Sequence, residues 1–413
     1  MKILLSAFAC APNRGSEPGV GWNWAKALSK NNEVYVITRE ENRKEIEAYR
    51  QEHTIPFHVE YFGISFFEEH TDIPFQKNLY TMVWQKKVVA FASRLHDKYH
   101  FDICHHITYA SFKYPTRLYQ LGIPLIVGPV GGGEVTPESC KQTYGLKDRI
   151  FEFIHDLQIT LTVHKKQFTR MCENATIILT TTQETYDCIP DTYKSKTEIM
   201  QTIGVAKSEI EGAFTRREYE EGKSFKVLYA GNLLPLKGVC LLPEIAKRIE
   251  DKCVVFQIIG DGPEKAKMQQ RIAEYGLSER FTFMGSVDRT KVLEYMDDAH
   301  LFIFPSFHDS GAMVLLEAMA RKLPALVLAT GGPGVHVKNG NGFRVEPKQS
   351  LVDIVEDFAK CIQRCKQDYL TSRETIDEMV DKAEEYLYSQ CVWEKKAEIM
   401  QEIYQKALEE NRK

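Results

Sequence analysis

The chain has 413 residues, which is too long for one compact hydrophobic core and predicts two domains of similar size. Hydrophobic residues make up 43% and charged residues 27%, the values of an ordinary globular protein. The formal net charge of -4 argues against a generic nucleic-acid binder, because phosphate backbones require a basic protein face.

The first half alternates short β-rich apolar runs with longer amphipathic stretches, which is typical of a parallel α/β sheet. The opening MKILLSAFAC is interpreted as the first strand rather than as a signal segment. Helices are expected at residues 20–30 and 76–99. Strands are expected near residues 2–9, 33–38, 57–62, 102–106, 124–128, 176–180 and 197–200.

Two glycine-rich loops follow strands of this half, at the sheet edge where parallel α/β folds bind ligands. The first contains Gly15 and Gly19 and either approaches a ligand or forms an ordinary tight turn. The second, GPVGGGE, ends at Glu134, whose carboxylate is a candidate to accept a hydrogen bond from a sugar hydroxyl. The alternative is a plain flexible loop. No G-x-G-x-x-G fingerprint is present, which disfavours a dinucleotide dehydrogenase.

A polar segment from Lys207 to Lys223 then interrupts the pattern and is the best candidate for an interdomain linker. The alternation restarts at Phe225, and the end of the chain is expected to be helical from about residue 371. Strands of this half are expected near residues 225–230, 253–259, 281–283, 300–304 and 324–328.

Two loops of the second half suit a nucleotide diphosphate. In GNLLPLKG, Lys237 stands at the entrance to a predicted helix, where an ammonium group beside helix N–H groups favours a diphosphate leaving group. In IIGDGPE, Gly260 and Gly262 form a turn that either borders the nucleotide base or is a plain strand-to-helix connection.

The segment FPSFHDSGAMVLLEAMA is the strongest candidate site. A helix is expected from about Gly311, with Ser310 as its cap and the N–H groups of Gly311 to Val314 as an anion site. Glu317 follows Asp309 by two helical turns, so both carboxylates are predicted to face one pocket, one toward the sugar and one toward the ribose. A capped amphipathic helix is the structural alternative.

Together these motifs resemble the retaining glycosyltransferases of family 4, which have the GT-B fold. The similarity spans nearly the whole chain. It is carried by the Gly15–Gly19 loop, GNLLPLKG, IGDGPE, FMGSV, DDAHLFIFPS, DSGAMVLLEAMA and the segment around Trp393 and Tyr404. The resemblance implies an α/β protein with two Rossmann-like domains facing across a cleft. It implies an acceptor domain at residues 1–205, a nucleotide-sugar domain at 224–385, and a C-terminal helix at 386–413 that packs back on the first domain.

The resemblance also assigns roles to individual residues. Lys237 is expected on the donor diphosphate, Asp309 on the donor sugar and Glu317 on the ribose. The expected donor-binding set is Gly15, Gly19, Asn232, Lys237, Gly260, Ser310, Gly311, Ala312, Met313, Val314 and Glu317. Three positions depart from the family pattern, because Asn232 replaces an Arg, Asp309 replaces a Glu, and Ala312 stands where Gly is common.

Members of this family often have a His near the transferred sugar, and this chain carries DICHHITYAS at that point. His105 and His106 are expected to face opposite sides of a strand, and His106 is favoured because Thr108 shares its face. A buried structural histidine is an equal alternative. With Glu134, the two histidines form the expected acceptor side.

The resemblance implies a retaining transferase that moves a sugar from a UDP-, GDP- or ADP-sugar to a glycan or lipid-linked acceptor, in polysaccharide biosynthesis and without a cofactor. The predicted catalytic residues are Lys237, Asp309, Glu317 and His106. No D-x-D sequence is present, so no metal is implied. The alternatives are a nucleotide-sugar epimerase or phosphorylase of the same fold, and a non-catalytic nucleotide-sugar-binding subunit, which Asn232 and Asp309 would suit.

Two regions suggest a peripheral membrane contact. Residues 62–84 are unusually aromatic, and residues 141–170 mix Lys and Arg with apolar residues. Basic residues beside an apolar helix face can hold a protein on an anionic membrane, near a lipid-linked acceptor. Core aromatics and solvated charges are the alternative. We therefore expect a cytoplasmic protein with reduced thiols, located either in solution or at the inner face of the membrane.

Overall fold

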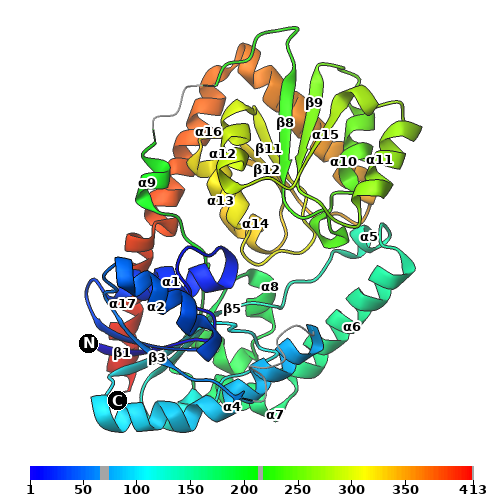
Figure 1. The fold of residues 1–413 in the computed structure, drawn as a ribbon. Helices are drawn as coiled ribbons and strands as arrows, with labels where there is room; N and C mark the ends of the chain where they lie inside the picture. Colours follow the sequence, from blue (N-terminus) through cyan, green and yellow to red (C-terminus); the bar gives the residue numbers. More distant parts are fainter. Residues whose placement is uncertain (66–73, 213–216, 412–413) are drawn as a thin grey trace. The chain divides into compact units, whose positions relative to one another are not determined.

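The computed structural model describes residues 1–65, 74–212 and 217–411. The chain forms two compact units, each containing one parallel sheet (Figure 1). Unit 1 comprises Met1–Gly133, Leu157–Gly204 and Trp393–Lys413, and unit 2 comprises Glu134–Asp156 and Val205–Val392. The expected assignment of residues 134–156 to the N-terminal domain is therefore corrected, because their contacts are mainly with the second unit.

Unit 1 contains a seven-stranded sheet in the order β3-β2-β1-β4-β5-β6-β7, with every neighbouring pair parallel. The strands are β1 (Lys2–Ala7), β2 (Glu33–Thr38), β3 (His58–Tyr61), β4 (Ile103–Thr108), β5 (Leu125–Val130), β6 (Ile177–Thr180) and β7 (Thr197–Ile199). All seven agree closely with the expected ranges. Strands β4 and β5 are buried throughout, as expected for central strands of a parallel sheet; β5 is continuously apolar, whereas β4 carries His105 and His106.

The longer helices of unit 1 are α1 (Ser16–Leu28), α2 (Arg43–Glu52), α4 (Pro74–Tyr99), α7 (Lys166–Asn174), α8 (Gln183–Asp187) and α17 (Trp393–Glu410). The C-terminal helix α17 returns to this unit, as expected, and packs on α1. The rings of Trp24 and Trp393 meet edge to face at 5.7 Å, and the buried Lys396 ammonium donates to the carbonyl of Gln201 at 2.5 Å. This charge and the aromatic pair hold the end of the chain in the unit 1 core.

Unit 2 contains a six-stranded parallel sheet in the order β10-β9-β8-β11-β12-β13. The strands are β8 (Phe225–Ala230), β9 (Val254–Ile259), β10 (Phe281–Gly285), β11 (Leu301–Phe304), β12 (Ala325–Leu328) and β13 (Phe343–Val345). Five of them match the expected ranges. The three-residue β13 was not predicted, because a run this short shows no recognisable periodicity.

The helices of unit 2 include α5 (Glu138–Lys141), α9 (Lys207–Ile210), α10 (Leu241–Arg248), α11 (Lys265–Glu274), α12 (Arg289–Asp298), α13 (Met313–Ala320), α14 (Gly331–His336), α15 (Leu351–Thr371) and α16 (Arg373–Tyr386). Helix α6 (Leu146–Val163) contains the boundary between the two units. The terminal helical region starts at Leu351, well before the expected residue 371. None of the helices in the described ranges combines the length and apolarity needed to cross a bilayer.

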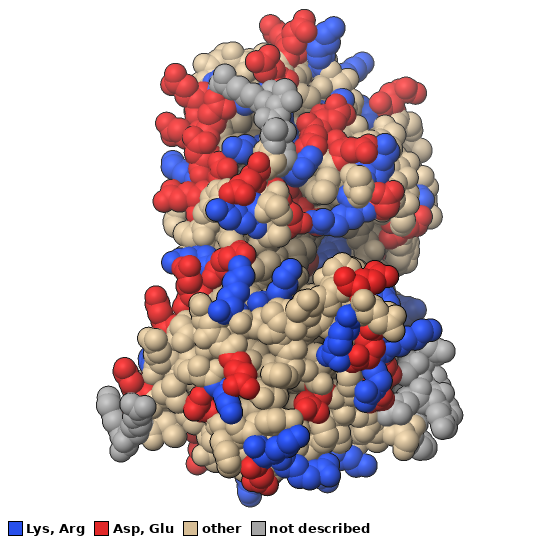
Figure 2. Space-filling view, turned by 60° about the vertical axis from the view of Figure 1, so that its left-hand side comes forward, with Lys and Arg blue, Asp and Glu red and all other residues tan. Residues whose placement is uncertain are grey.

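The surface charges agree with a weakly acidic protein. On the face drawn in Figure 2, the acidic and basic side chains of the described residues are interspersed rather than segregated. The expectation from net charge about nucleic acids stays a prediction.

Candidate functional site

The candidate donor site lies in unit 2, at the carboxyl ends of β8 and β11. These two strands are neighbours at the centre of the sheet, and the strand order reverses between them. In open α/β sheets, such a reversal separates the loops that follow the two strands and leaves room for a ligand. The loop after β8 carries Lys237, and the loop after β11 carries Asp309. Topology therefore brings together two residues that are 72 positions apart.

Close backbone packing holds these loops in place. Gly238 has φ 64°, and a Cβ at this position would overlap the carbonyl oxygen of Pro305 at the end of β11. Gly260 has φ 125°, and a Cβ there would overlap the carbonyl of Gly231 in the loop after β8. Both glycines are thus required by contacts between loops. For Gly260, the interpretation as a plain structural turn fits better than a contact with the nucleotide base.

Asp309 connects Lys237 to the start of helix α13. One carboxylate oxygen forms an ion pair with the Lys237 ammonium, and the side chains of the two residues are 15% and 20% exposed. The other oxygen accepts hydrogen bonds from the backbone N–H groups of Gly311 at 3.0 Å and Ala312 at 2.9 Å. Both oxygens of Asp309 are therefore occupied within unit 2.

This arrangement corrects three details of the expected helix terminus. The helix begins at Met313 rather than near Gly311, and Asp309 rather than Ser310 satisfies the preceding N–H groups. The N–H groups of Gly311 and Ala312, expected to bind an anion, are consequently occupied. The first two N–H groups of the helix, at Met313 and Val314, have no hydrogen-bond partner in the described part of the chain. The anion site is thus reduced to these two groups and Lys237.

Ala312 adopts a left-handed backbone conformation, with φ 56° and ψ 50°. An L-amino acid with a Cβ is disfavoured there by roughly 1–2 kcal/mol, whereas glycine is not. This accounts for the glycine that is common at this position in the resembling family. In this chain, the hydrogen bond from Ala312 to Asp309 helps to hold the strained residue.

Glu317 lies on α13 and is paired with a residue that sequence reasoning missed. The Arg289 guanidinium, at the start of α12, donates to Glu317 at 2.6 Å and also pairs with Glu209 of α9. Burial is the largest single influence and lowers the pKa of Arg289, but the hydrogen bonds and charges of Glu317 and Glu209 together outweigh it, so the pKa of Arg289 is raised. The only signal in the sequence was an Arg shortly after FMGSV, which alone does not distinguish a site residue from a surface charge.

A pocket of about 220 Å³ opens beside this ion pair and is lined by Glu317, Arg289, Glu209 and neighbouring residues. Asp309 does not line this pocket, so the prediction that both carboxylates face one pocket stays a prediction. The two carboxylates mark two adjoining parts of the site. Asp309 belongs with Lys237, and Glu317 belongs with Arg289.

Glu134 is brought to the donor loops within unit 2. Its side chain is buried, and its Cγ lies 3.4 Å from where a Cβ of Gly331 would stand. The turn at Gly331 and Gly332 is in turn bound to the Asp309 backbone, because the N–H of Gly332 donates to the Asp309 carbonyl at 2.7 Å. The expected acceptor-side carboxylate is therefore a neighbour of the Asp309 loop.

Three further predicted donor residues have contacts of their own within their own unit. Gly15 and Gly19 belong to unit 1, where they lie at the start of α1, and a Cβ on Gly19 would overlap the carbonyl of Arg14. Asn232 lies in the loop after β8 with its side chain exposed. Its backbone carbonyl accepts a hydrogen bond from the Tyr229 hydroxyl at 3.1 Å. The roles of these three residues remain predictions.

His105 and His106 are both enclosed in the core of unit 1. His105 contacts the Tyr404 hydroxyl at 2.6 Å and the Gly128 carbonyl at 2.7 Å. His106 contacts Ser6 at 3.1 Å and Gln85 at 3.0 Å. The side chains face opposite directions, as expected. Neither is more than 1% exposed, so the structure favours the structural alternative over the expected acceptor-side role of His106.

The same burial keeps both imidazoles neutral. Desolvation lowers the pKa of His105 to about 4. Desolvation, together with the neighbouring His105, lowers the pKa of His106 to about 3. A general base that works near neutral pH needs a pKa closer to 7 and contact with its substrate. Neither histidine meets these conditions in this conformation.

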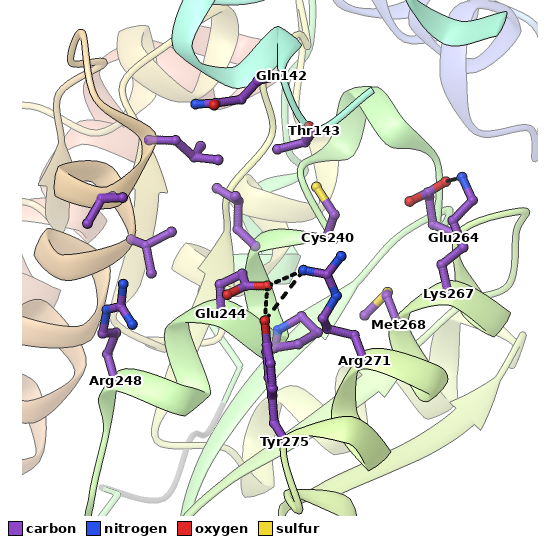
Figure 3. Close-up of a pocket in the computed structure, with 15 residues that line it drawn as sticks. Gln142, Thr143, Cys240, Glu244, Arg248, Glu264, Lys267, Met268, Arg271 and Tyr275 are labelled. Atoms are coloured by element: carbon purple, nitrogen blue, oxygen red, sulfur yellow. Dashed lines mark hydrogen bonds and ion pairs between the residues drawn. The ribbon is translucent and has the colours of Figure 1, made fainter. Parts of the chain in front are cut away.

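A second pocket, of about 430 Å³, lies between α10, α11, α15 and residues Gln142 and Thr143 (Figure 3). Its charged side chains are already paired. Arg271 and the Tyr275 hydroxyl both donate to Glu244, at 2.6 and 2.7 Å, and Lys267 pairs with Glu264 at 2.6 Å. The predicted donor residues do not line this pocket, so it does not compete with the Lys237 site as the place for a diphosphate.

Comparison with known proteins identifies the second half of the chain. Residues 213–386 match the family model of the glycosyl transferases group 1. A 2-deoxystreptamine N-acetyl-D-glucosaminyltransferase from Niallia circulans is 27% identical over 53% of this chain and 57% of its own length. A putative teichuronic acid biosynthesis glycosyltransferase of Bacillus subtilis is 25% identical over 37% of this chain and 36% of its own length.

Solved structures match nearly the entire chain. A lipopolysaccharide outer core galactosyltransferase in its apo form has a TM-score of 0.65 at 18% identity, covering 98% of this chain and 100% of that one. The Anabaena protein HepE in complex with UDP has a TM-score of 0.60 at 14% identity, covering 98% and 99%. At this level of identity the similarity shows the fold, which is GT-B.

The contact between Gly238 and Pro305 gives a testable prediction. We expect Gly238→Ala to lower the free energy of unfolding by about 1–3 kcal/mol more than Gly222→Ala. Gly222 also has a positive φ, of 82°, but a Cβ there meets open space, so the control carries the backbone strain without the overlap. Urea denaturation of the two variants measures the difference. Equal destabilisation would show that the two loops are not held together by this contact.

Proposed function

We propose that the protein is a glycosyltransferase that moves a sugar from a nucleotide-diphosphate sugar to a glycan or lipid-linked acceptor during polysaccharide assembly. The observation that carries the proposal is the position of the Lys237 ammonium. It lies where the strand order reverses at the centre of the unit 2 sheet, in the part of the chain that matches the glycosyl transferases group 1 model. Helix α13 begins beside it, and its first two N–H groups, at Met313 and Val314, are unpaired in the described part of the chain. A cation beside a helix N-terminus suits a diphosphate.

The named relatives support the same class of donor and acceptor. Solved structures of similar fold contain UDP, and one contains UDP-glucose. By their names, the curated relatives are a 2-deoxystreptamine N-acetyl-D-glucosaminyltransferase and a putative teichuronic acid biosynthesis glycosyltransferase. Their matches cover about half or less of their own length, so the donor and acceptor of this chain are part of the proposal.

Donor binding would exchange the partners seen in the structure. The diphosphate takes the place of Asp309 beside Lys237, so the ammonium keeps a negative partner throughout. The ribose hydroxyls reach Glu317 in the pocket beside Arg289. Asp309, released from Lys237 but still bound to the N–H groups of Gly311 and Ala312, then has one oxygen for the sugar.

We propose retention of configuration without a protein nucleophile. The bond between the sugar C1 and the phosphate oxygen breaks, and the acceptor oxygen forms the new bond on the same face. The acceptor proton passes to the departing phosphate oxygen. Lys237 and the helix N–H groups stabilise the charge that develops on the phosphate, and the loops supply positioning. The chemistry then needs neither a general base nor a metal ion.

The charge contacts of this site can be tested separately. A thermal-shift and hydrolysis screen of nucleotide sugars first identifies the donor. With that donor, we expect Lys237→Ala and Glu317→Ala each to reduce kcat/KM about 100- to 1,000-fold, because one preorganised contact is worth about 2.7–4 kcal/mol. Lys226→Ala is the matched control, because Lys226 lies on β8, the strand that precedes the Lys237 loop, and pairs with Asp298. Near-wild-type activity of both site variants, with the fold checked by circular dichroism, would refute the site.

The mechanism predicts the metal and stereochemical behaviour. Transfer should persist in EDTA, and NMR of the product should find the anomeric configuration of the donor retained. Loss of activity in chelator with recovery on adding a divalent metal would contradict metal-independent chemistry, and an inverted product would contradict retention. Conversion of the donor in the absence of any acceptor would instead favour an epimerase. Donor binding with neither transfer nor hydrolysis would favour a non-catalytic subunit.

Helix α6 supports the peripheral membrane contact as part of this proposal. Phe151 is 60% and Phe153 67% exposed, which is unusual for aromatic side chains, and Lys147 lies on the same helix. Further exposed apolar side chains on α6 are Leu146, Ile150, Ile154, Leu157 and Leu161. An apolar helix surface with basic neighbours suits the headgroup region of an anionic bilayer. Part of the other predicted region, residues 66–73, lies outside the described residues.

We expect the protein to co-sediment with vesicles that contain anionic lipid at low salt, and less at high salt, because exposed charges are screened. The double variant Phe151→Ser/Phe153→Ser should lose most of this binding. Val352→Ser is the control, since Val352 is 58% exposed on α15 in unit 2. Equal binding by all three proteins would exclude α6 as the contact, and absence of binding at low salt would favour a soluble acceptor.

A further inference from the structure

Three side chains that commonly bind metals meet beside the donor loop. Glu152 and His155 are three residues apart on α6, and His308 lies in the loop between β11 and α13. One potential ligand atom from each lies within 4.8 Å of the others. All three are half-buried and belong to unit 2. They come from segments that are more than 150 positions apart, so only the fold brings them together.

We propose that Glu152, His155 and His308 form a binding site for zinc. Two imidazoles and one carboxylate are a donor set that zinc uses, whereas magnesium and calcium prefer oxygen ligands alone. The spacing of three residues puts Glu152 and His155 on one face of α6. A fourth position remains for water, as in other zinc sites with three protein ligands.

The distances allow the ion to bind with small side-chain movements. Around a tetrahedral zinc with bonds of about 2.0–2.2 Å, neighbouring ligand atoms lie about 3.3 Å apart. The present separations of at most 4.8 Å therefore need to shorten by no more than about 1.5 Å. The imidazole rings of His155 and His308 are already neighbours, with centroids 4.9 Å apart.

Neighbouring groups already orient two of the three ligands. A Glu152 oxygen accepts a hydrogen bond from the backbone N–H of Thr136 at 3.1 Å. The Nδ1 atom of His155 lies 3.6 Å from Asp156, which itself accepts a hydrogen bond from Lys141 at 2.8 Å. Carboxylates beside ligating histidines commonly set the ring orientation and strengthen metal binding.

The position suggests what the ion does. His308 immediately precedes Asp309, the partner of Lys237, whereas Glu152 and His155 belong to the segment that unit 2 receives from the first half of the sequence. A zinc ion bound by all three side chains ties that segment to the Asp309 loop. Its effect is structural, because the proposed sugar transfer uses no metal.

The test uses the full-length protein and zinc alone. Isothermal titration in a buffer without chelator or nucleotide sugar should find about one zinc per chain, and zinc should raise Tm, because an ion that binds only the folded state stabilises it. Magnesium at the same concentration should do neither. Since no donor is present, this result is independent of whether the protein transfers sugar.

Variants then assign the ligands. We expect His155→Gln, His308→Gln and Glu152→Gln each to weaken zinc binding at least about tenfold, since each removes one of three protein ligands. The control is His164→Gln, because His164 is exposed just beyond the end of α6 and is not part of the cluster. Circular dichroism checks that each variant is folded. Absence of stoichiometric zinc binding, or binding that survives in His155→Gln/His308→Gln, would overturn the proposal and point to the cysteine thiols.

Discussion

The ion pair between Lys237 and Asp309 is the interaction on which the rest of the donor site depends. It joins the loops that follow the two central strands of the unit 2 sheet. A partly buried ammonium without a partner would be costly, commonly by 3–5 kcal/mol. Asp309 removes this cost in the absence of donor. Its second oxygen accepts hydrogen bonds from the N–H groups of Gly311 and Ala312, which would otherwise be unpaired. These contacts therefore hold the two loops together.

The length of the Asp309 side chain makes this arrangement possible. An aspartate oxygen reaches the N–H groups two and three residues further along the chain, as in the turns that aspartate commonly forms. A glutamate, expected from the family pattern, is one methylene longer and reaches farther from its own backbone. The shorter side chain thus holds the turn that leads into α13, in addition to the sugar contact that the resemblance implies. The second family cation is absent at Asn232, and the described structure instead has Arg289 beside Glu317. Both carboxylates, Asp309 and Glu317, therefore have a cationic partner before donor binds.

Much of the fold could be predicted because its signals are local. The apolar runs of β5 and β11, and the glycines that follow β8 and β9, are visible in short windows of sequence. The failures concern features that depend on tertiary contacts. His105 and His106 are indistinguishable from functional histidines until the partners Tyr404 and Gln85 are known. Asp309 and Ser310 are both good capping residues, and only the backbone path after β11 decides between them. Arg289 and the zinc ligands carry no motif.

The segment at residues 134–156 shows why a family match does not contain the whole site. The matched residues, 213–386, include Lys237, Asp309 and Glu317. They exclude Glu209, the second partner of Arg289, and Glu134, which is buried beside the turn that binds the Asp309 backbone. Both are nonetheless part of unit 2. Two neighbours of the site thus come from segments outside the match. Glu209 pairs with Arg289, and Glu134 packs beside the turn that contacts the Asp309 loop. Differences in donor preference between related chains should therefore be sought in those segments as well as in the motifs themselves.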